Sequence, residues 1–151
     1  MSIALDADAA SRIARAFAPA AWYGDRTHYF YARAKLRSDP LYPGVIDALR
    51  GSEAPLLDLG CGIGLLAHAL RDAGLSMPYR GVDNDPGKVA AARRAGANAG
   101  LDGVSFECLD LAARLPAHRG NVAILDVLQF VPPEAQDTIL DAAVAMLVPG
   151  A

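Results

Sequence analysis

Short apolar runs alternate with stretches of helical spacing along the last two-thirds of the chain. The runs at 55–59, 79–83, 104–109 and 121–127 have the length and composition of buried strands. The stretches near 64–73, 86–97 and 133–147 carry apolar residues every three or four positions, which is typical of helices that bury one face. This alternation predicts an α/β fold in which helices sandwich a parallel sheet.

The first fifty residues have a different pattern. Helical spacing covers 11–17, 28–36 and 45–49, and Pro19, Pro40 and Pro43 interrupt it. Seven of the ten aromatic side chains fall between positions 17 and 42. We therefore expect two parts, an N-terminal helical segment over 1–50 and an α/β domain over 51–151.

Composition narrows the class of protein. A chain of 151 residues fits one domain whose core needs no metal or disulfide. The formal charge of -3 gives no overall basic field for nucleic acid. Cys61 and Cys108 do not form a metal-ligand pair and are expected to be reduced thiols. Asp6 and Asp8 stand where a signal peptide needs apolar residues, and no apolar run approaches about 18 residues, so we expect a cytoplasmic protein without a membrane span.

The segment 56–64, Leu-Leu-Asp-Leu-Gly-Cys-Gly-Ile-Gly, carries the most information about function. An apolar strand ends near Asp58 and runs into three alternating glycines, and a helical pattern follows at once. Strand, glycine loop and helix in this order predict a site for an adenosine-containing cofactor. A dinucleotide motif would need a third glycine where this chain has Leu65. Asp58 also favours a cationic sulfonium cofactor over a pyrophosphate.

These residues and four later segments resemble the motifs of class I S-adenosylmethionine-dependent methyltransferases. The second strand ends in Gly-Val-Asp-Asn-Asp and the third in Phe-Glu-Cys-Leu-Asp-Leu. The fourth strand and its exit read Asn-Val-Ala-Ile-Leu-Asp-Val-Leu-Gln-Phe-Val-Pro over 121–132, and the chain closes on Leu-Val-Pro-Gly. The resemblance implies a Rossmann-like fold. Because a helix-ending Val-Pro-Gly turn stands just before Ala151 and a four-stranded sheet would keep an open edge, we expect that further residues belong to the natural protein or that this chain is a fragment. Completing the sheet would take on the order of 50 more residues. It assigns cofactor contacts to Asp58, Gly60, Cys61, Gly62, Gly64, Asp83, Asn84, Asp110, Leu111, Leu125 and Asp126.

Within those contacts the resemblance gives each segment a role. Asp83 would bind both ribose hydroxyls, Asp110 would accept from the adenine amino group, and the amide after it, that of Leu111, would meet the ring. Leu125 and Asp126 would line the end that holds the methionine moiety. Asp83 alone does not discriminate between cofactors, because a dinucleotide enzyme also carries an acid at this strand end.

The resemblance also implies the reaction, methyl transfer from S-adenosylmethionine to a small, apolar or aromatic acceptor, with S-adenosylhomocysteine as the other product. Relatives often carry a histidine base after the fourth strand, where this chain has Gln129 and Phe130. Tyr23 and His28 are the candidates to act as base or to orient the acceptor. The aromatic N-terminal segment would cover the pocket as a lid and exclude water, and Arg33 is the candidate partner of the cofactor's carboxylate.

Other functions remain open from the sequence. A half-domain could hold the cofactor without turnover, a nicotinamide-dependent oxidoreductase could use the same glycine loop, and an aminopropyltransferase could share the fold. Methylation of nucleic acid is less favoured, because 121–130 contains no Asn-Pro-Pro-aromatic segment of the kind that holds a flipped base. The sequence leaves the oligomeric state and the acceptor open.

Overall fold

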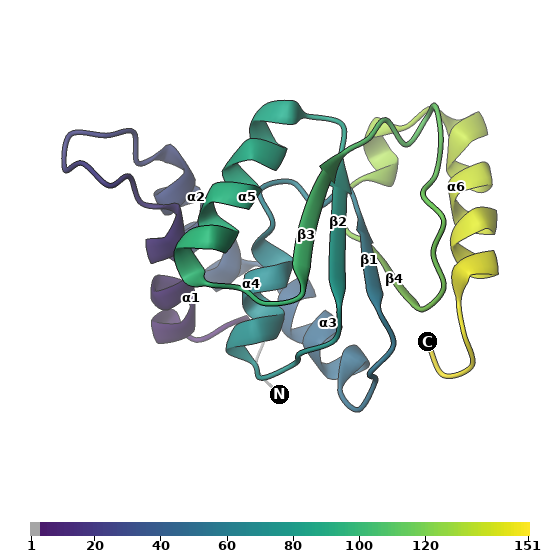
Figure 1. Cartoon of the computed structure of the whole chain (residues 1–151), viewed down its shortest axis with the longest axis horizontal. Helices are drawn as coiled ribbons and strands as arrows, with labels where there is room; N and C mark the ends of the chain where they lie inside the picture. The colour runs from purple at the N-terminus through teal and green to yellow at the C-terminus, as the bar shows by residue number, and fades with distance from the viewer. Residues whose placement is uncertain (1–3) are drawn as a thin grey trace.

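A computed structural model describes residues 4–151, and a four-stranded parallel sheet lies at its centre (Figure 1). The strands are β1 (Leu56–Leu59), β2 (Tyr79–Asp83), β3 (Val104–Cys108) and β4 (Asn121–Ile124), in the order β3-β2-β1-β4. The helices are α1 (Ala7–Ala14), α2 (Thr27–Ser38), α3 (Leu41–Leu49), α4 (Leu65–Asp72), α5 (Pro86–Ala99) and α6 (Pro133–Met146). No helix in the described range 4–151 has the length and apolar composition needed to cross a membrane.

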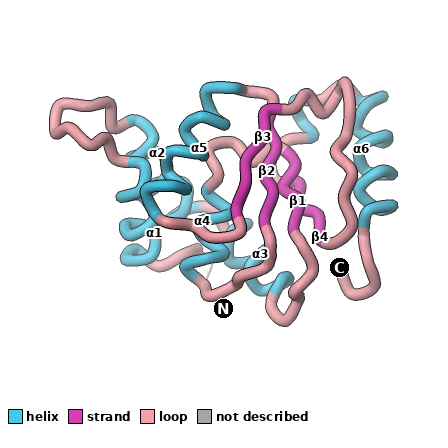
Figure 2. Tube along the Cα trace, in the orientation of Figure 1, coloured by secondary structure: helices cyan, strands magenta, loops and turns pink. Residues whose placement is uncertain are grey.

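Helices cover both faces of the sheet, as the alternating pattern predicts (Figure 2). The larger core joins α1 to α5 with one face of the sheet and includes Leu36, Leu70, Val89 and Phe106. The smaller core lies beneath α6 on the opposite face, where Leu57 and Val82 pack with Ile139. Because β1 pairs with β2 on one side and β4 on the other, its residues are buried and it forms the middle of the sheet.

Three elements have a boundary that differs by more than two residues from the sequence prediction. β4 stops at Ile124 rather than at 127, because Asp126 has a φ of 53° and leaves the extended conformation. α1 starts at Ala7, where the Asp6 carboxylate caps it by accepting from the Ala9 amide at 2.7 Å. α3 starts at Leu41, four residues before the predicted stretch, with Pro40 as its N-cap residue.

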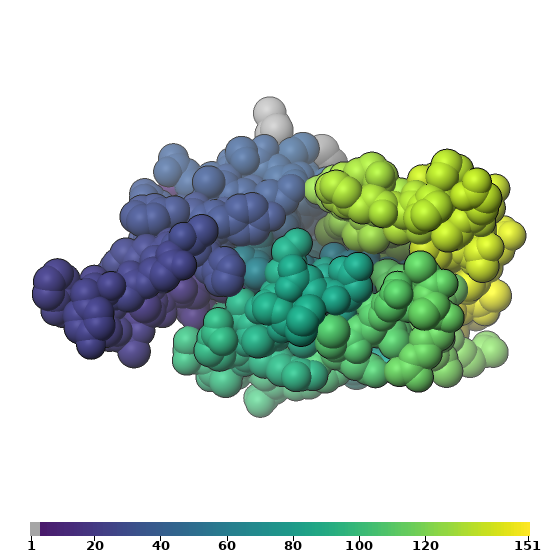
Figure 3. Space-filling model, turned by 90° about the horizontal axis from the view of Figure 1, so that it is seen from above, coloured from purple at the N-terminus to yellow at the C-terminus, as the bar shows by residue number. Residues whose placement is uncertain are grey.

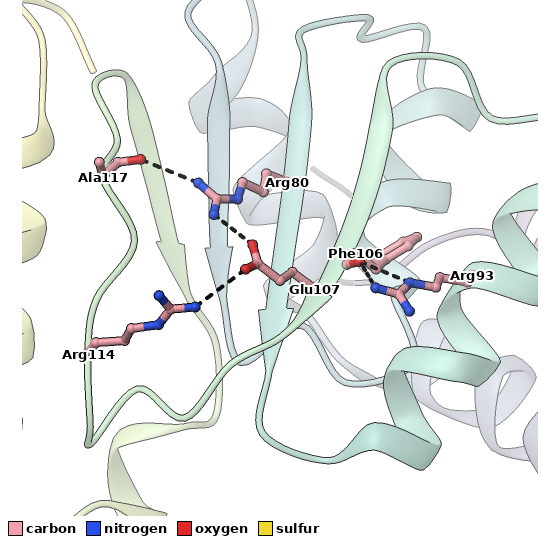
Figure 4. Close-up of polar contacts among 6 residues, drawn as sticks. All are labelled: Arg80, Arg93, Phe106, Glu107, Arg114 and Ala117. Carbon is pink, nitrogen blue, oxygen red and sulfur yellow. Dashed lines mark hydrogen bonds and ion pairs between the residues drawn. The ribbon is translucent and has the colours of Figure 1, made fainter.

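The connection between β3 and β4 holds no helix and is tied to the sheet by charged side chains (Figure 4). Arg80 on β2 donates to Glu107 on β3 at 2.7 Å and to the Ala117 carbonyl at 3.4 Å. Arg114 adds a weaker ion pair to Glu107, with 3.9 Å between nitrogen and oxygen. On α5, Arg93 donates twice to the Phe106 carbonyl, at 2.8 and 3.0 Å, and so ties that helix to the edge strand β3.

Candidate cofactor and acceptor site

A cavity of about 670 Å³ opens where the strands end at their carboxyl side. Parallel α/β sheets bind ligands at this edge, because the loops that leave neighbouring strands diverge there. Its walls come from the glycine loop, from the loops after β2, β3 and β4, and from α2 and α3 of the N-terminal segment. The volume lies in the range that small-molecule and cofactor sites occupy.

The glycine loop turns in a conformation that other residues adopt only with strain. Gly60 has a φ of 78°, and a Cβ there would stand 2.2 Å from a methyl group of Val127. Gly62 has a φ of 57°, and a Cβ there would meet no protein atom within 4 Å. Gly60 is therefore required by packing against the loop after β4, whereas Gly62 leaves bare main chain beside the cavity that it lines.

Asp83, 9% exposed at the end of β2, fastens the glycine loop to the sheet. Its Oδ2 accepts from the Gly62 amide and its Oδ1 from the Asp85 amide, both at 2.9 Å. Each carboxylate oxygen can accept a second hydrogen bond, so both remain able to accept from a diol in the cavity. Asp85 caps α5 in turn, accepting from the amides of Gly87 and Lys88. The cap of α5 is therefore Asp85, and Asp83 takes no part in it.

Asp58 lies beneath the loop and is almost completely buried, at 2% exposed. The Tyr79 hydroxyl, itself buried, donates to Asp58 Oδ2 at 2.5 Å, a length typical of a hydroxyl bonded to a carboxylate. Burial raises the pKa of Asp58 to about 6, although the Tyr79 hydrogen bond opposes the shift. The carboxylate is therefore mostly ionised at neutral pH and places a negative charge below the cavity. Burial also raises the pKa of the neighbouring Cys61, which stays a neutral thiol.

An ion pair links the N-terminal segment to the end of β4. Lys35 on α2 donates to Asp126 Oδ2 at 3.1 Å and also meets the Asp39 carboxylate at 2.6 Å. The hydrogen bonds to Asp39 and to Asp126 raise the pKa of Lys35, so the side chain stays cationic. Lys35 and Asp126 both line the cavity, and Asp126 is the one non-glycine residue in the described chain with positive φ. The strained residue thus stands beside the cavity and is held by a charge from the N-terminal segment.

The cavity gathers residues that the sequence analysis had assigned from separate segments. Lining it are Asp58, Gly60, Cys61, Gly62, Asp83, Asn84, Asp110, Leu111, Leu125 and Asp126. Gly64 does not line it but stands at the start of α4, where a Cβ would lie 2.7 Å from the Phe106 ring. Tyr23 and His28 are not brought to the cavity: both are exposed, Tyr23 to 78%, before or at the start of α2.

Several lining residues were not singled out by the sequence analysis. Tyr31 and Lys35, one helical turn apart on α2, form one wall together with Tyr42, whereas Arg33 does not line the cavity. Gln129, noted in the sequence only for standing where relatives carry histidine, and Phe130 line the side next to the end of β4. The spacing of Tyr31 and Lys35 was the available signal, because residues four apart on a helix share a face.

Charge in the cavity favours a cationic ligand. Four carboxylates line it, those of Asp58, Asp83, Asp110 and Asp126, against two ammonium groups, those of Lys35 and Lys88. A pyrophosphate would meet net repulsion there, and a sulfonium would meet net attraction.

Comparisons with known proteins agree with this geometry. A family model described as a methyltransferase domain matches residues 56–150. The ubiquinone biosynthesis O-methyltransferase of Xylella fastidiosa strain 9a5c is 35% identical over 102 residues, which cover 66% of this chain and 39% of that relative. The chain thus spans about two-fifths of the length of the curated relatives it matches.

Solved structures show the same fold. TehB from Haemophilus influenzae superposes with a TM-score of 0.65 at 20% identity, covering 80% of this chain and 41% of TehB. Magnesium protoporphyrin IX methyltransferase from Synechocystis PCC 6803, solved with bound S-adenosylhomocysteine, superposes with a TM-score of 0.61 at 25% identity. That superposition covers 71% of this chain and 50% of the cyanobacterial enzyme.

Proposed function

This chain belongs to the methyltransferase-domain family, and we propose that it binds S-adenosylmethionine and transfers the methyl group to a small organic molecule. The observation that carries the proposal is the site itself. Bare main chain at Gly62 faces a cavity of about 670 Å³, and the Asp83 carboxylate stands beside it with lone pairs to spare. The sinefungin complex of the glycopeptide N-methyltransferase MtfA, a structural neighbour at 20% identity and a TM-score of 0.64, shows a ligand of this class on a related fold.

The residues divide the cavity into three parts. Asp83 accepts from the ribose hydroxyls at the end of β2, while Asp110 and Leu111 hold the adenine after β3. Leu125 and Asp126 border the methionine end. Lys35, a cation of the N-terminal segment, lines this end of the cavity and Arg33 does not. We therefore assign Lys35, in place of Arg33, as the residue that pairs with the carboxylate of the cofactor.

Transfer of the methyl group needs alignment more than covalent chemistry. When bound, the cofactor supplies an electrophilic methyl carbon on a sulfonium. The acceptor oxygen or nitrogen would gain the methyl group and lose its proton to solvent, and the sulfur would keep the electron pair of the broken carbon–sulfur bond as a neutral thioether. The protein's part is to hold acceptor, carbon and sulfur in line and to keep water out. Tyr31, Gln129 and Phe130 are the residues placed to form the acceptor side.

The acceptor class is proposed from the lining and from the relatives' names. Tyr31 and Phe130 offer aromatic surface, and Gln129 offers an amide that can orient a hydroxyl. The O-methyltransferase relative acts in ubiquinone biosynthesis, and the cyanobacterial neighbour acts on magnesium protoporphyrin IX. We therefore infer an aromatic small molecule that accepts the methyl group on oxygen.

A nicotinamide-dependent oxidoreductase is the alternative that the cavity disfavours. Leu65, 4% exposed at the start of α4, occupies the position of the third glycine of a dinucleotide motif. Asp58 adds a buried negative charge below the loop where a pyrophosphate would lie.

Incubation with tritium-labelled S-adenosylmethionine and a small-molecule extract tests the proposal. We expect label to appear in an extractable organic product, and a variant with Asp83→Ala to lose most of that transfer. A chain that binds S-adenosylhomocysteine but labels nothing in extract fractions would be a cofactor-binding module instead of an enzyme. Label in nucleic acid or protein alone would contradict the small-molecule assignment.

A further inference from the structure

The charge of this chain is divided unevenly along the sequence. Positions 11–38 hold six Arg and Lys side chains and one Asp, a formal charge of +5. The whole chain carries -3, so the remaining residues carry -8. The overall acidity therefore conceals a basic segment, in which Arg12 pairs with Asp72 and Lys35 with Asp39 and Asp126, while Arg26 and Arg37 stay unpaired in the described part of the chain.

The loop between α1 and α2 projects from the body of the molecule and carries exposed aromatic side chains. Figure 1 shows it extending away from the sheet, and Figure 3 shows the same segment at one end of the molecule from above. Trp22 is 85% exposed and Tyr23 78% exposed, with their ring centroids 5.8 Å apart. Adjacent exposed aromatic rings at a projecting tip form a contiguous apolar patch, and such patches mark candidate contact sites for another surface.

Arginines extend this apolar tip along one side of α2. Arg26, Phe30 and Arg37 lie four and seven residues apart, so they share a stripe of the helix. Phe30 is 57% exposed, and neither arginine side chain forms an ion pair or hydrogen bond with the described residues. We call Trp22, Tyr23, Arg26, Phe30 and Arg37 the arginine–aromatic face.

We propose that the arginine–aromatic face docks onto the surface of an anionic phospholipid bilayer. Trp and Tyr favour the depth of the lipid headgroups, where the ring is apolar and the polar edge stays wet. Unpaired arginines beside them match the negative headgroups, and each adds attraction near such a surface. Unpaired arginines and exposed aromatic rings thus lie together on one projecting part of the molecule, and this combination is the observation that favours an anionic bilayer as the partner.

The shape of the face separates a bilayer from a nucleic acid. Single strands are bound in a basic groove in which bases stack between aromatic rings. Residues 18–30 line neither the cofactor cavity nor the smaller cavity between α5 and β3, and their loop projects from the body of the molecule. A projecting tip suits a soft, planar interface instead. Tyr31 and Lys35 on the neighbouring side of α2 line the large cavity, so docking brings one wall of that cavity close to the lipid.

Trp22 is the sole tryptophan of the chain, so its fluorescence reports directly on this contact. We expect its emission to shift to the blue when vesicles containing half phosphatidylglycerol are added to the 151-residue chain, and to be quenched by lipids brominated near the headgroup. The shift should be weak with pure phosphatidylcholine and should largely disappear at about 0.5 M salt, where charges are screened within a few ångströms.

A double variant, Arg26→Gln with Arg37→Gln, keeps the reporter and removes two charges from the face. Its vesicle affinity should fall about 25-fold, about fivefold for each cation near a charged membrane. The matched control, Arg94→Gln with Arg119→Gln, removes two exposed arginines outside the basic segment, and it should bind as the unaltered chain does. An equal loss in both double variants would contradict the proposal.

Three further results would overturn it. They are the absence of any blue shift with anionic vesicles, equal binding to neutral and anionic vesicles, and tighter binding of a single-stranded oligonucleotide through Arg26 and Arg37. None of these outcomes depends on methyl transfer, so the proposal fails or stands separately from the proposed function.

Discussion

Replacing Tyr79 with Phe removes the hydroxyl that donates to the buried Asp58 carboxylate. In the folded chain burial raises the pKa of Asp58 to about 6, against about 3.9 in an unfolded chain. A carboxyl group whose pKa is higher in the folded chain than in the unfolded chain stabilises the folded chain fully only below its unfolded pKa. That stabilisation is lost as the pH rises from about 4 to about 6. At neutral pH the buried charge therefore has a net cost of about 3 kcal/mol, which would be larger without the Tyr79 hydrogen bond.

The loss of the hydroxyl should therefore depend on pH. At pH 7.5 Asp58 is ionised, and a hydrogen bond to a charged group contributes about 2 kcal/mol, so Tyr79→Phe should lower the free energy of unfolding by about that amount. At pH 4.5 the carboxyl is mostly protonated, and the same change should cost about 1 kcal/mol or less. The pKa of Asp58 should rise further in the variant, because the interaction that lowers it is gone.

Urea unfolding followed by circular dichroism, at several pH values between 4.5 and 7.5, measures this difference. Tyr42→Phe is the matched control, because Tyr42 is also buried but its hydroxyl has no hydrogen-bond partner among residues 4–151. Its effect on stability should be small and independent of pH. The reasoning is refuted if Tyr79→Phe costs the same at both ends of the range, or more at the acid end.

Three other changes test neighbouring parts of the account. Burial lowers the pKa of His68 to about 4, so this histidine's contribution to stability is present above pH 6.5 and is lost as pH falls to 4. When the pH is lowered from 7.5 to 4.5, the free energy of unfolding of His68→Leu should therefore rise by about 2 to 3 kcal/mol relative to that of the unaltered chain. A difference between the two chains that stays the same at both pH values in urea unfolding would refute this. Gly62→Ala should lower stability by about 1 to 2 kcal/mol through its positive φ, yet reduce S-adenosylhomocysteine affinity at least about tenfold by filling open space. Gly60→Ala should instead unfold the chain more readily than Gly62→Ala, because its Cβ meets Val127; equal urea midpoints for the two variants would count against the packing argument.

The parallel sheet and the position of the site follow from local patterns. Each strand is a short apolar run before a turn, so the type of element and its order along the chain were predictable. The fourth strand was predicted to end at 127, three residues later than β4 ends, because apolar residues continue to Val127 although the backbone turns at Asp126. Apolar runs do not report φ, and a strained residue gives no signal in the pattern.

Contacts between distant segments were not predictable in the same way. Asp58 and Tyr79 are 21 residues apart, and their meeting depends on the register in which Leu56 stands opposite Tyr79. Lys35 and Asp126 are 91 residues apart and meet only because α2 folds over the end of β4. The placement of Tyr23 depends on the direction of a loop that contains Pro19 and Gly24, which residue types alone do not set. The role of the N-terminal segment as a lid stays a prediction.

The central claim is that the cavity takes a sulfonium nucleoside, held by Asp83, in place of a diphosphate. Calorimetric titration of the chain with S-adenosylhomocysteine and with NAD tests it directly. We expect the thioether nucleoside to bind at one site, and Asp83→Asn to weaken that binding by about 1.5 to 3 kcal/mol. Asp85→Asn, which preserves the cap of α5, should leave it unchanged. Tighter binding of NAD, or equal affinity in the two variants, would contradict the account.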